Sequence, residues 1–339
     1  MTKLEIDAYR ENNALNQSYL KGVAVNDPKI KKNDSESIAC LKGSLTDLLC
    51  LTPELQDDFY YFSKLEKYPT PQIKESFDKA FEIDSEWDDL LLLEVFRSIS
   101  KTKKRDELVL KDFYDNENYW QDLVESQGKK VITQDYFNIC SGATATLQTH
   151  PFTAHHFDNS EGLISYQIPI YDDIDFTYDS YKKVNVKRKG LLDLFIKDEI
   201  NKTVQFKDLK TTSSTPDAWF KQARQFGYPF QCAWYYDIIN NLFPDYKQLM
   251  PELIIYSFAA PTKPFTKVLT EDDLFTGRYG VNHHKSYVEH STGVINSITH
   301  RVHGWEECLT RYLICQEKGY ADWDIDYWKN KGIVTKNIW

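Results

Sequence analysis

Two segments of alternating polar and apolar residues, joined by a short polar connection, constrain the fold more than any other feature of this sequence. The first segment runs from about Val184 to Lys197 and the second from about Thr203 to Lys210, with residues 198–201 between them. Side chains alternate between the two faces of a strand, and a short polar connection is typical of antiparallel neighbours. The sequence therefore predicts a β-hairpin.

The two faces of this hairpin carry different residues. Even positions of the first strand are mostly apolar and are expected in the core: Val184, Val186, Leu192, Leu194 and Ile196. Its odd positions carry Lys183, Lys187, Lys189 and Asp193, and on the second strand Asp208 and Lys210 share a face. A turn centred on Glu199 and Ile200 places Asp193 opposite Phe206 and diagonal to Asp208. Diagonal neighbours lie about 7–8 Å apart at the backbone.

This hairpin is expected to bring two acids and a lysine together. Two neighbouring carboxylates repel each other, and one takes up a proton unless a cation neutralises both. Carboxylate oxygens suit Mg²⁺ or Mn²⁺, and Lys210 could hold a phosphate or polarise a water. An exposed hairpin with ordinary surface charges explains the spacing about equally well.

An ordered set of short motifs resembles the PD-(D/E)XK nuclease superfamily, most of all its RecB-like branch and the phage exonucleases of the exonuclease VIII kind. The set is Gly190-x-x-Asp193, then Asp208-x-Lys210, then Gln231-x-x-x-Tyr235. An earlier segment, Gly43-Ser-Leu-Thr-Asp47 followed by Thr52-Pro-Glu54, is similar to a Gly-x-x-x-His helix and the Leu-x-Pro-Glu phrase of the family. The resemblance covers about residues 41–239, with gaps.

The resemblance implies a restriction-endonuclease-like α/β fold, in which helices flank a mixed central sheet. The order of expected elements (helices, strand, hairpin, helix, strand, helix) predicts the same class. We expect an N-terminal helical region, 1–115, that supplies Asp47 and one face of the cleft. A nuclease-like core with a C-terminal helical extension would occupy 116–339.

The resemblance also implies roles for single residues. The expected metal ligands are Asp193, Asp208, the Leu209 carbonyl and Asp47. Catalysis would use Lys210 with Asp193 and Asp208, and the expected substrate contacts are Gln231, Tyr235, Lys187 and Lys189. Asp47 stands where the family often has histidine. Many members carry a further glutamate on the preceding strand, where this chain offers Gln167 or, just outside the strand, Glu161; which of them lies at the metal site is left open.

The function implied by this resemblance is a Mg²⁺- or Mn²⁺-dependent deoxyribonuclease, acting as an exonuclease on duplex DNA ends in phage-type recombination. A single-strand-annealing protein is the expected partner. The alternatives are an endonuclease of the same fold, in restriction or repair, and a non-catalytic DNA-binding or assembly module. Related phage exonucleases form rings, so a homo-oligomer is compatible with the resemblance, although no segment identifies an interface. Polarity and processivity stay open.

The composition limits the class of protein and the cellular compartment that we expect. The chain has 339 residues, with 41 Lys and Arg against 51 Asp and Glu, and a net charge of −10. This balance argues against a general nucleic-acid coat protein, but a local basic lane can still track phosphates. Six cysteines without CxxC spacing predict neither a zinc site nor a disulfide framework. With no apolar leader and no run near the roughly 20 residues that cross a bilayer, we expect a cytoplasmic protein of a bacterium or phage-infected cell, without a membrane partner.

Overall fold

The computed structural model describes residues 2–25, 38–178, 181–288 and 295–318. The chain divides into two compact units. One, the sheet unit, combines Lys3–Cys40 with Thr149–Trp339, and the other, the helical unit, is Leu41–Gln148. These boundaries differ from the predicted division into 1–115 and 116–339, which was drawn by expected function and stays a prediction.

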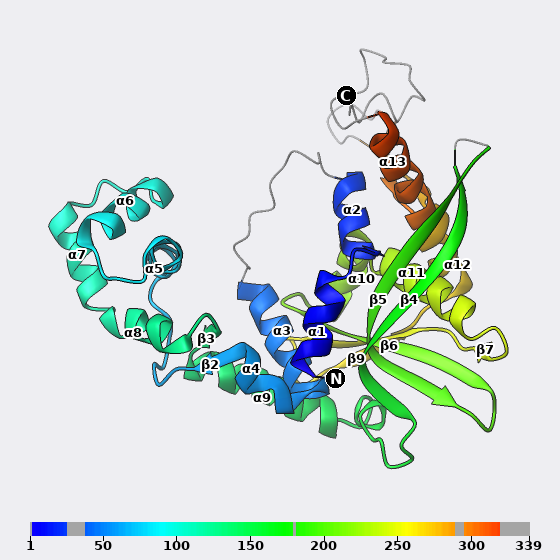
Figure 1. The fold of residues 1–339 in the computed structure, drawn as a ribbon, viewed down its shortest axis with the longest axis horizontal. Helices are drawn as coiled ribbons and strands as arrows, with labels where there is room; N and C mark the ends of the chain where they lie inside the picture. Colours follow the sequence, from blue (N-terminus) through cyan, green and yellow to red (C-terminus); the bar gives the residue numbers. More distant parts are fainter. Residues whose placement is uncertain (1, 26–37, 179–180, 289–294, 319–339) are drawn as a thin grey trace. The chain divides into compact units, whose positions relative to one another are not determined.

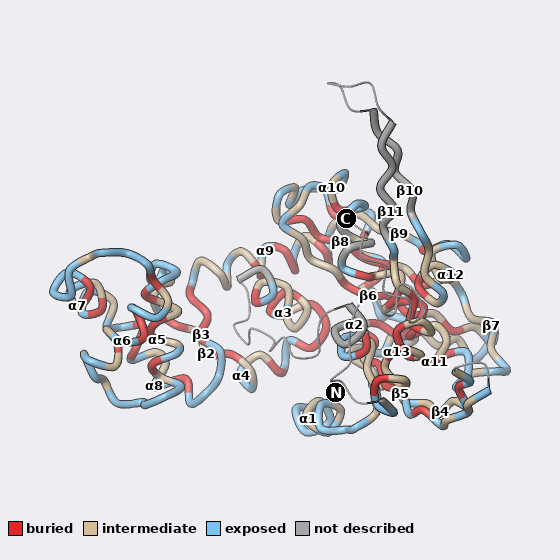
Figure 2. The backbone as a smooth tube through the Cα atoms, turned by 90° about the horizontal axis from the view of Figure 1, so that it is seen from above, coloured by how far each residue is buried: buried red, intermediate tan, exposed pale blue. Residues whose placement is uncertain are grey.

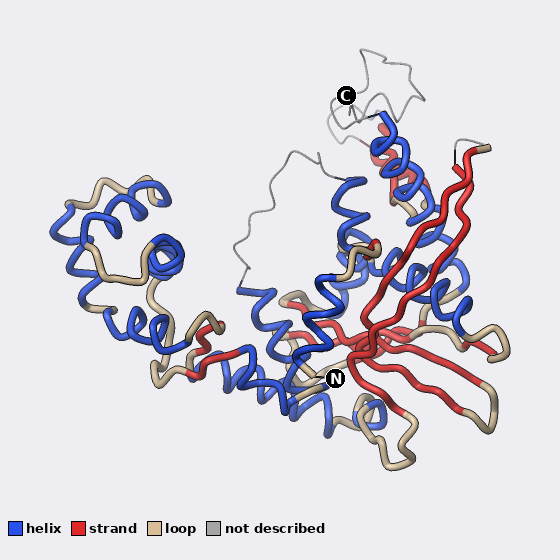
Figure 3. The backbone as a smooth tube through the Cα atoms, in the orientation of Figure 1, coloured by secondary structure: helices blue, strands red, loops and turns tan. Residues whose placement is uncertain are grey.

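The sheet unit is built on a seven-stranded mixed sheet, with the strand order β1-β5-β6-β8-β9 and with β4 and β7 pairing β5 and β6. The strands are β1 (Leu15–Asn16), β4 (Ile164–Tyr178), β5 (Lys182–Asp198), β6 (Thr203–Thr212), β7 (Lys247–Gln248), β8 (Glu252–Ser257) and β9 (Phe265–Val268). Antiparallel pairs join β4 to β5 and β5 to β6, whereas β6 and β8 run parallel. The long β4–β5 pair stands out in Figure 3.

The predicted hairpin is present as β5 and β6, but its register differs from the predicted one. Phe206 pairs with Phe195, and the ladder ends at the pair of Leu194 and Lys207. Asp193 and Asp208 are therefore the next residue on each strand, and the placement of Asp193 opposite Phe206 was wrong. The connection contains four residues, 199–202, because the Asp198 carboxylate accepts hydrogen bonds from backbone N–H groups within it. The shift between the two strands is even, so Asp193 and Asp208 still lie on the same side of the hairpin.

The alternation of core residues along β5 shifts by one position at Asp193. Leu192 lies in the main core, as expected of the even face, but the next residue in that core is Phe195; Leu194 is buried outside it. The ladder with β4 skips the pair of Gln167 and Asp193, and Gln167 has a left-handed backbone with φ of 52°. A regular strand cannot place residues three apart on one face. The irregularity therefore turns Asp193 toward the side that Leu192 occupies.

Helices cover this sheet, and the most deeply buried of them is α11 (Tyr228–Leu242), which packs against β4 and β5 (Figure 1). Pro229 in its first turn suits a helix start, because proline lacks the N–H group that would be unsatisfied there. The other helices of the unit are α1 (Lys3–Glu11), α2 (Gln17–Val25), η2 (Ala154–His156), α10 (Pro216–Gln225), α12 (Glu271–Tyr279) and α13 (Trp305–Lys318). A separate two-stranded sheet pairs β10 (Val281–Val288) with β11 (Ile295–Val302).

The helical unit has its own core, rich in aromatic side chains. Its elements are α3 (Ile38–Leu51, which begins just before the unit), η1 (Pro53–Leu55), α4 (Gln56–Phe59), β2 (Tyr60–Phe62), α5 (Pro71–Ile83), α6 (Asp89–Ile99), α7 (Asp106–Tyr114), α8 (Glu117–Ser126), β3 (Lys130–Ile132) and α9 (Gln134–Thr149). Phe77, Phe113 and Trp120 are buried, and the Phe77 ring contacts both of the others. Figure 2, in which buried residues are red, shows such residues in both units.

The predicted fold class is confirmed: the chain is a mixed α/β protein with a central mixed sheet, flanking helices and helices near its N-terminus. Among the described residues, no helix has the length and apolar character needed to cross a membrane.

Candidate active site

The candidate site begins at Asp193, where β5 loses its regular ladder. The Leu209 backbone N–H donates to Asp193 Oδ2 at 2.9 Å, and Gln167 Nε2 donates to Asp193 Oδ1 at 3.1 Å. The Asp193 carboxylate thus accepts from a β6 N–H group in place of a backbone carbonyl. Its other oxygen accepts from Gln167 on β4. Three neighbouring strands fix its orientation.

Asp208 and Lys210 lie on β6 beside it. They are two apart on one strand and share a face, as predicted. Lys210 Nζ forms an ion pair with Asp208 Oδ2, and Gln231 Nε2 donates to Asp208 Oδ1 at 3.2 Å. Asp208 is almost fully buried. Its position in the middle of the sheet, between β5 and β8, explains that burial.

Gln231 and Tyr235 approach the acids from α11. They are four residues apart and therefore share a helix face. Gln231 Nε2 lies 3.3 Å from the Tyr235 hydroxyl, to which it donates. The Tyr235 ring packs directly over Gly190, where an added Cβ atom would come within 2.7 Å of two ring carbons. The Gly-x-x-Asp spacing thus has a physical reason, because Gly190 makes room for the helix that contacts Asp208.

Gln167, and not Glu161, is the residue that β4 brings to the site. Gln167 donates to Asp193, whereas Glu161 is exposed in the loop before the strand. An amide at this position supplies a hydrogen-bond donor, where a carboxylate would add negative charge. The site therefore holds two acids on neighbouring strands, each with an amide donor, Gln167 at Asp193 and Gln231 at Asp208.

Burial and mutual repulsion shape the electrostatics of this site. Burial, and next the charge of Asp208, raise the pKa of Asp193 to about 7, although Lys210 and two hydrogen bonds act in the opposite direction. Burial lowers the pKa of Lys210, but the charges of Asp208 and Asp193 together outweigh burial and raise it above its ordinary value. Lys210 is therefore a permanent cation at this site. Two carboxylates share one lysine, which leaves excess negative charge.

The two acids fit a divalent cation. Asp208 Oδ2 is buried, and the Lys210 ammonium pairs with it. Carboxylate and carbonyl oxygens are the ligands that Mg²⁺ prefers, and an ion between Asp193 and Asp208 would remove their repulsion. The Leu209 carbonyl lies on the same strand, next to Asp208. Within the described ranges, no group of three or more His, Cys, Asp or Glu side chains is placed to hold a metal.

The remaining predicted residues are Lys189, Lys187 and Asp47. Lys189 is buried and donates to the backbone carbonyls of Tyr9 and Asn12 at 2.7 and 2.6 Å, at the end of α1. Its ammonium already holds a helix terminus, and its expected role in guiding phosphates stays a prediction. Lys187 is exposed on β5, and its contact with substrate stays a prediction. Asp47 lies on α3 in the helical unit, and its role as a ligand stays a prediction too.

The sequence analysis missed Tyr228, whose ring centre lies 5.4 Å from Lys210 Nζ. An ammonium over an aromatic face is attracted by the ring electrons. Tyr228 begins α11 directly after Gly227, which has a φ of 69° and so permits the sharp turn from α10. The Gly-Tyr-Pro sequence at 227–229 indicates the start of a helix. No sequence spacing indicates that Tyr228 would lie beside Lys210 on β6.

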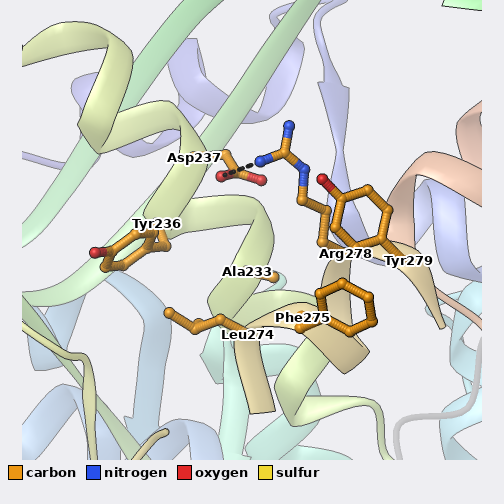
Figure 4. A pocket seen from close by; sticks show the side chains of 7 residues that line it. All are labelled: Ala233, Tyr236, Asp237, Leu274, Phe275, Arg278 and Tyr279. Carbon is orange, nitrogen blue, oxygen red and sulfur yellow. Dashed lines mark hydrogen bonds and ion pairs between the residues drawn. The ribbon is translucent and has the colours of Figure 1, made fainter. Parts of the chain in front are cut away.

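A pocket of about 180 Å³ lies elsewhere, between α11 and α12. Figure 4 shows its lining, with Asp237 and Arg278 joined across one side and Leu274 and Phe275 below. Arg278 also pairs with Glu306, so its charge is already balanced. None of the residues at the candidate site lines this pocket.

Comparisons with known proteins do not identify a family for this chain. No family model matches the chain, and no curated protein matches it. Among solved structures, the chain is similar to a protein from Eubacterium rectale described as a "putative exonuclease", with 13% sequence identity over 85% of this chain and 93% of that chain. The TM-score is 0.38. We infer neither fold nor function from a likeness at this level.

Proposed function

We propose that this chain is a metal-dependent deoxyribonuclease of the PD-(D/E)XK kind. The observation that carries the proposal is the convergence of Asp193, Asp208 and Lys210 on two adjacent strands, with Gln231 and Tyr235 contributed by α11. Burying two acids beside a lysine is costly, and a fold without chemistry to perform has no need of it. The motifs that resemble the superfamily fall on the residues that converge.

The expected ligands of the ion are Asp193, Asp208 and the Leu209 carbonyl, with Mg²⁺ or Mn²⁺ as the metal. When bound, such an ion polarises a phosphodiester and lowers the pKa of a water. Lys210 stabilises the negative charge that grows on the phosphate, because its ammonium is fixed and permanently charged. Gln167 and Gln231 each hold one oxygen of a carboxylate. The second oxygen of Asp193 accepts from the Leu209 N–H, and the second oxygen of Asp208 pairs with Lys210.

The resemblance extends the proposal to an exonuclease that acts on duplex DNA ends in phage-type recombination, with a single-strand-annealing protein as its partner. An endonuclease acting in restriction or repair would use the same residues. Only an exonuclease needs an end, so linear and closed-circular DNA separate the two.

A second candidate, a non-catalytic DNA-binding or assembly module, is favoured by one observation. Gln167 stands where the family often has a glutamate, so the site carries one negative charge fewer. A module of this kind would bind DNA without cleaving it.

Digestion of end-labelled linear duplex and of closed-circular DNA in Mg²⁺ tests both candidates. We expect the wild-type protein to degrade the linear DNA. Lys210→Ala should reduce the rate by about 10²-fold or more, since one charged group that stabilises a transition state contributes at this level. Exposed Lys183→Ala is the matched control and should leave the rate unchanged. Equal rates for wild type and Lys210→Ala, or no cleavage by the wild type, would overturn the proposal.

A further inference from the structure

A row of aromatic rings begins at the candidate site and extends to the surface; we call Trp219, Phe220, Phe226 and Tyr228 the aromatic cluster. Trp219 and Tyr228 are stacked with their centres 5.9 Å apart. Phe220 contacts Trp219 at 5.3 Å, and Phe226 contacts Tyr228 at 5.9 Å. The rings thus form one continuous packed group, made by α10 and the turn into α11.

The two ends of the aromatic cluster face solvent, although its centre is buried. Trp219 is 1% exposed, whereas Phe220 and Phe226 are 51% and 54% exposed. A single exposed apolar side chain is ordinary on a protein surface. Here the two exposed rings are instead the ends of a packed aromatic group, and the buried rings hold them in place.

The aromatic cluster is continuous with the site. The Tyr228 ring lies 5.4 Å from Lys210 Nζ, so one face of the cluster meets the lysine proposed to hold phosphate. The turn that carries Phe226 is fixed from α2, because Lys21 Nζ donates to the Phe226 carbonyl. A strand with a phosphate at Lys210 would therefore have its next groups beside these rings.

The charged residues around the aromatic cluster indicate the kind of ligand that it binds. Lys21 and Lys210 contact the aromatic cluster, and Lys221 is exposed on α10 next to Phe220; Asp217 is an exposed acid on the same helix. Apolar rings among several lysines suit a ligand with flat apolar faces and an anionic backbone. Unpaired nucleobases have both, and stacking on aromatic rings tolerates any base.

We propose that the aromatic cluster stacks on unpaired bases of the strand whose phosphate lies at Asp193, Asp208 and Lys210, an inference that rests on the proposed function. Bases inside a duplex already stack on their neighbours and cannot offer their faces. The substrate at this site is therefore a single strand or the frayed end of a duplex.

Binding of a short, fluorescently labelled oligothymidylate, measured by anisotropy in EDTA, tests the proposal without cleavage. The double variant Phe220→Ala/Phe226→Ala should weaken binding by about tenfold or more, and a blunt-ended hairpin duplex should be affected less. Phe226→Leu keeps the apolar bulk but loses the aromatic face, so it should also weaken binding. Phe275→Ala is the control, because Phe275 is 60% exposed on α12 and contacts Tyr279 instead of the cluster.

Equal affinity of wild type and double variant for oligothymidylate, or no binding by the wild type, would overturn the inference. Equal weakening by Phe275→Ala would do the same, as would full affinity in Phe226→Leu, which would show that apolar bulk and not a stacked ring makes the contact. The proposed function is judged apart from this, by digestion. A protein that digests DNA but binds oligothymidylate independently of the two phenylalanines keeps its function and loses this site. A protein that needs them for binding but digests nothing keeps the site and loses the function.

Discussion

Gln167 decides, at the scale of single residues, how much negative charge the candidate site carries. Its left-handed backbone aims the amide at Asp193, to which it donates a hydrogen bond at 3.1 Å. A non-glycine residue with positive φ is uncommon and is found more often at functional sites. The amide stabilises the Asp193 carboxylate when no ion is present, and its carbonyl oxygen remains available to one.

Replacing Gln167 by glutamate should make the protein more dependent on metal. The change removes the donor to Asp193 and adds a third negative charge, so the metal-free protein should lose about 1–3 kcal/mol of stability. Mg²⁺ should then raise the melting temperature more than it does in the wild type. Thermal unfolding in EDTA and in Mg²⁺ measures both effects. An unchanged response to Mg²⁺ would place Gln167 outside the ion site.

Which residues of the candidate site share a face could be predicted from sequence, because their spacing follows regular geometry. Asp208 and Lys210 are two apart on a strand, and Gln231 and Tyr235 are four apart on a helix. Lys189 could not be assigned in this way. Lys189 and Asp193 are four residues apart, so a regular strand would place them on one face. The irregularity at Asp193, which depends on pairing with β4, gives the two residues different surroundings.

Contacts between elements give Gly190 its role. This glycine lets α11 lie close enough to β5 for the Tyr235 ring to cover the strand. Gly190→Ala should therefore push Tyr235 away and cost about 1–3 kcal/mol, as overpacking in a close-packed core does. Chemical denaturation measures the loss. Gly142→Ala is the matched control, since nothing lies within 4 Å of its added Cβ on α9, and it should be neutral or slightly stabilising.

A buried cluster joins η2 to β6 and β8. Lys207 Nζ lies 2.8 Å from His156 Nδ1 and 3.2 Å from Glu252 Oε2, and the His155 ring lies beside the His156 ring at a tilt of 49°. Burial, and next the charge of Lys207, lower the pKa of His156 from 6.5 to about 4, with Glu252 opposing. The unfolded chain therefore binds a proton that the folded chain does not between these two values.

Stability should consequently fall as the pH drops from about 6.5 to about 4, because the folded pKa is the lower one. The loss should be on the order of 3 kcal/mol, at about 1.4 kcal/mol per pKa unit. His156→Gln keeps a polar partner for Lys207 and removes this titration. Unfolding free energies of both proteins across the range are the measurement. Parallel curves would show that His156 does not titrate as described.

The mixed α/β class of the whole molecule could be predicted from sequence. The division of the chain into two compact units could not. Periodicity reveals strands and helices locally, and the hairpin then fixes the centre of the sheet. Which distant segments join that sheet depends on packing between helices. Tyr19 on α2 contacts Tyr312 on α13 at 6.1 Å, and such contacts place Lys3–Cys40 with the second half of the chain. No local pattern in the sequence encodes that pairing.

The central claim is that Asp193 and Asp208 together bind one divalent ion, and Mg²⁺ titration by calorimetry tests it most directly. The wild-type protein should give a binding isotherm that both Asp193→Asn and Asp208→Asn abolish. Asp173→Asn, an exposed acid on β4, should bind like the wild type. Isotherms that are the same in all four proteins, or the absence of Mg²⁺ binding by the wild type, would contradict the account.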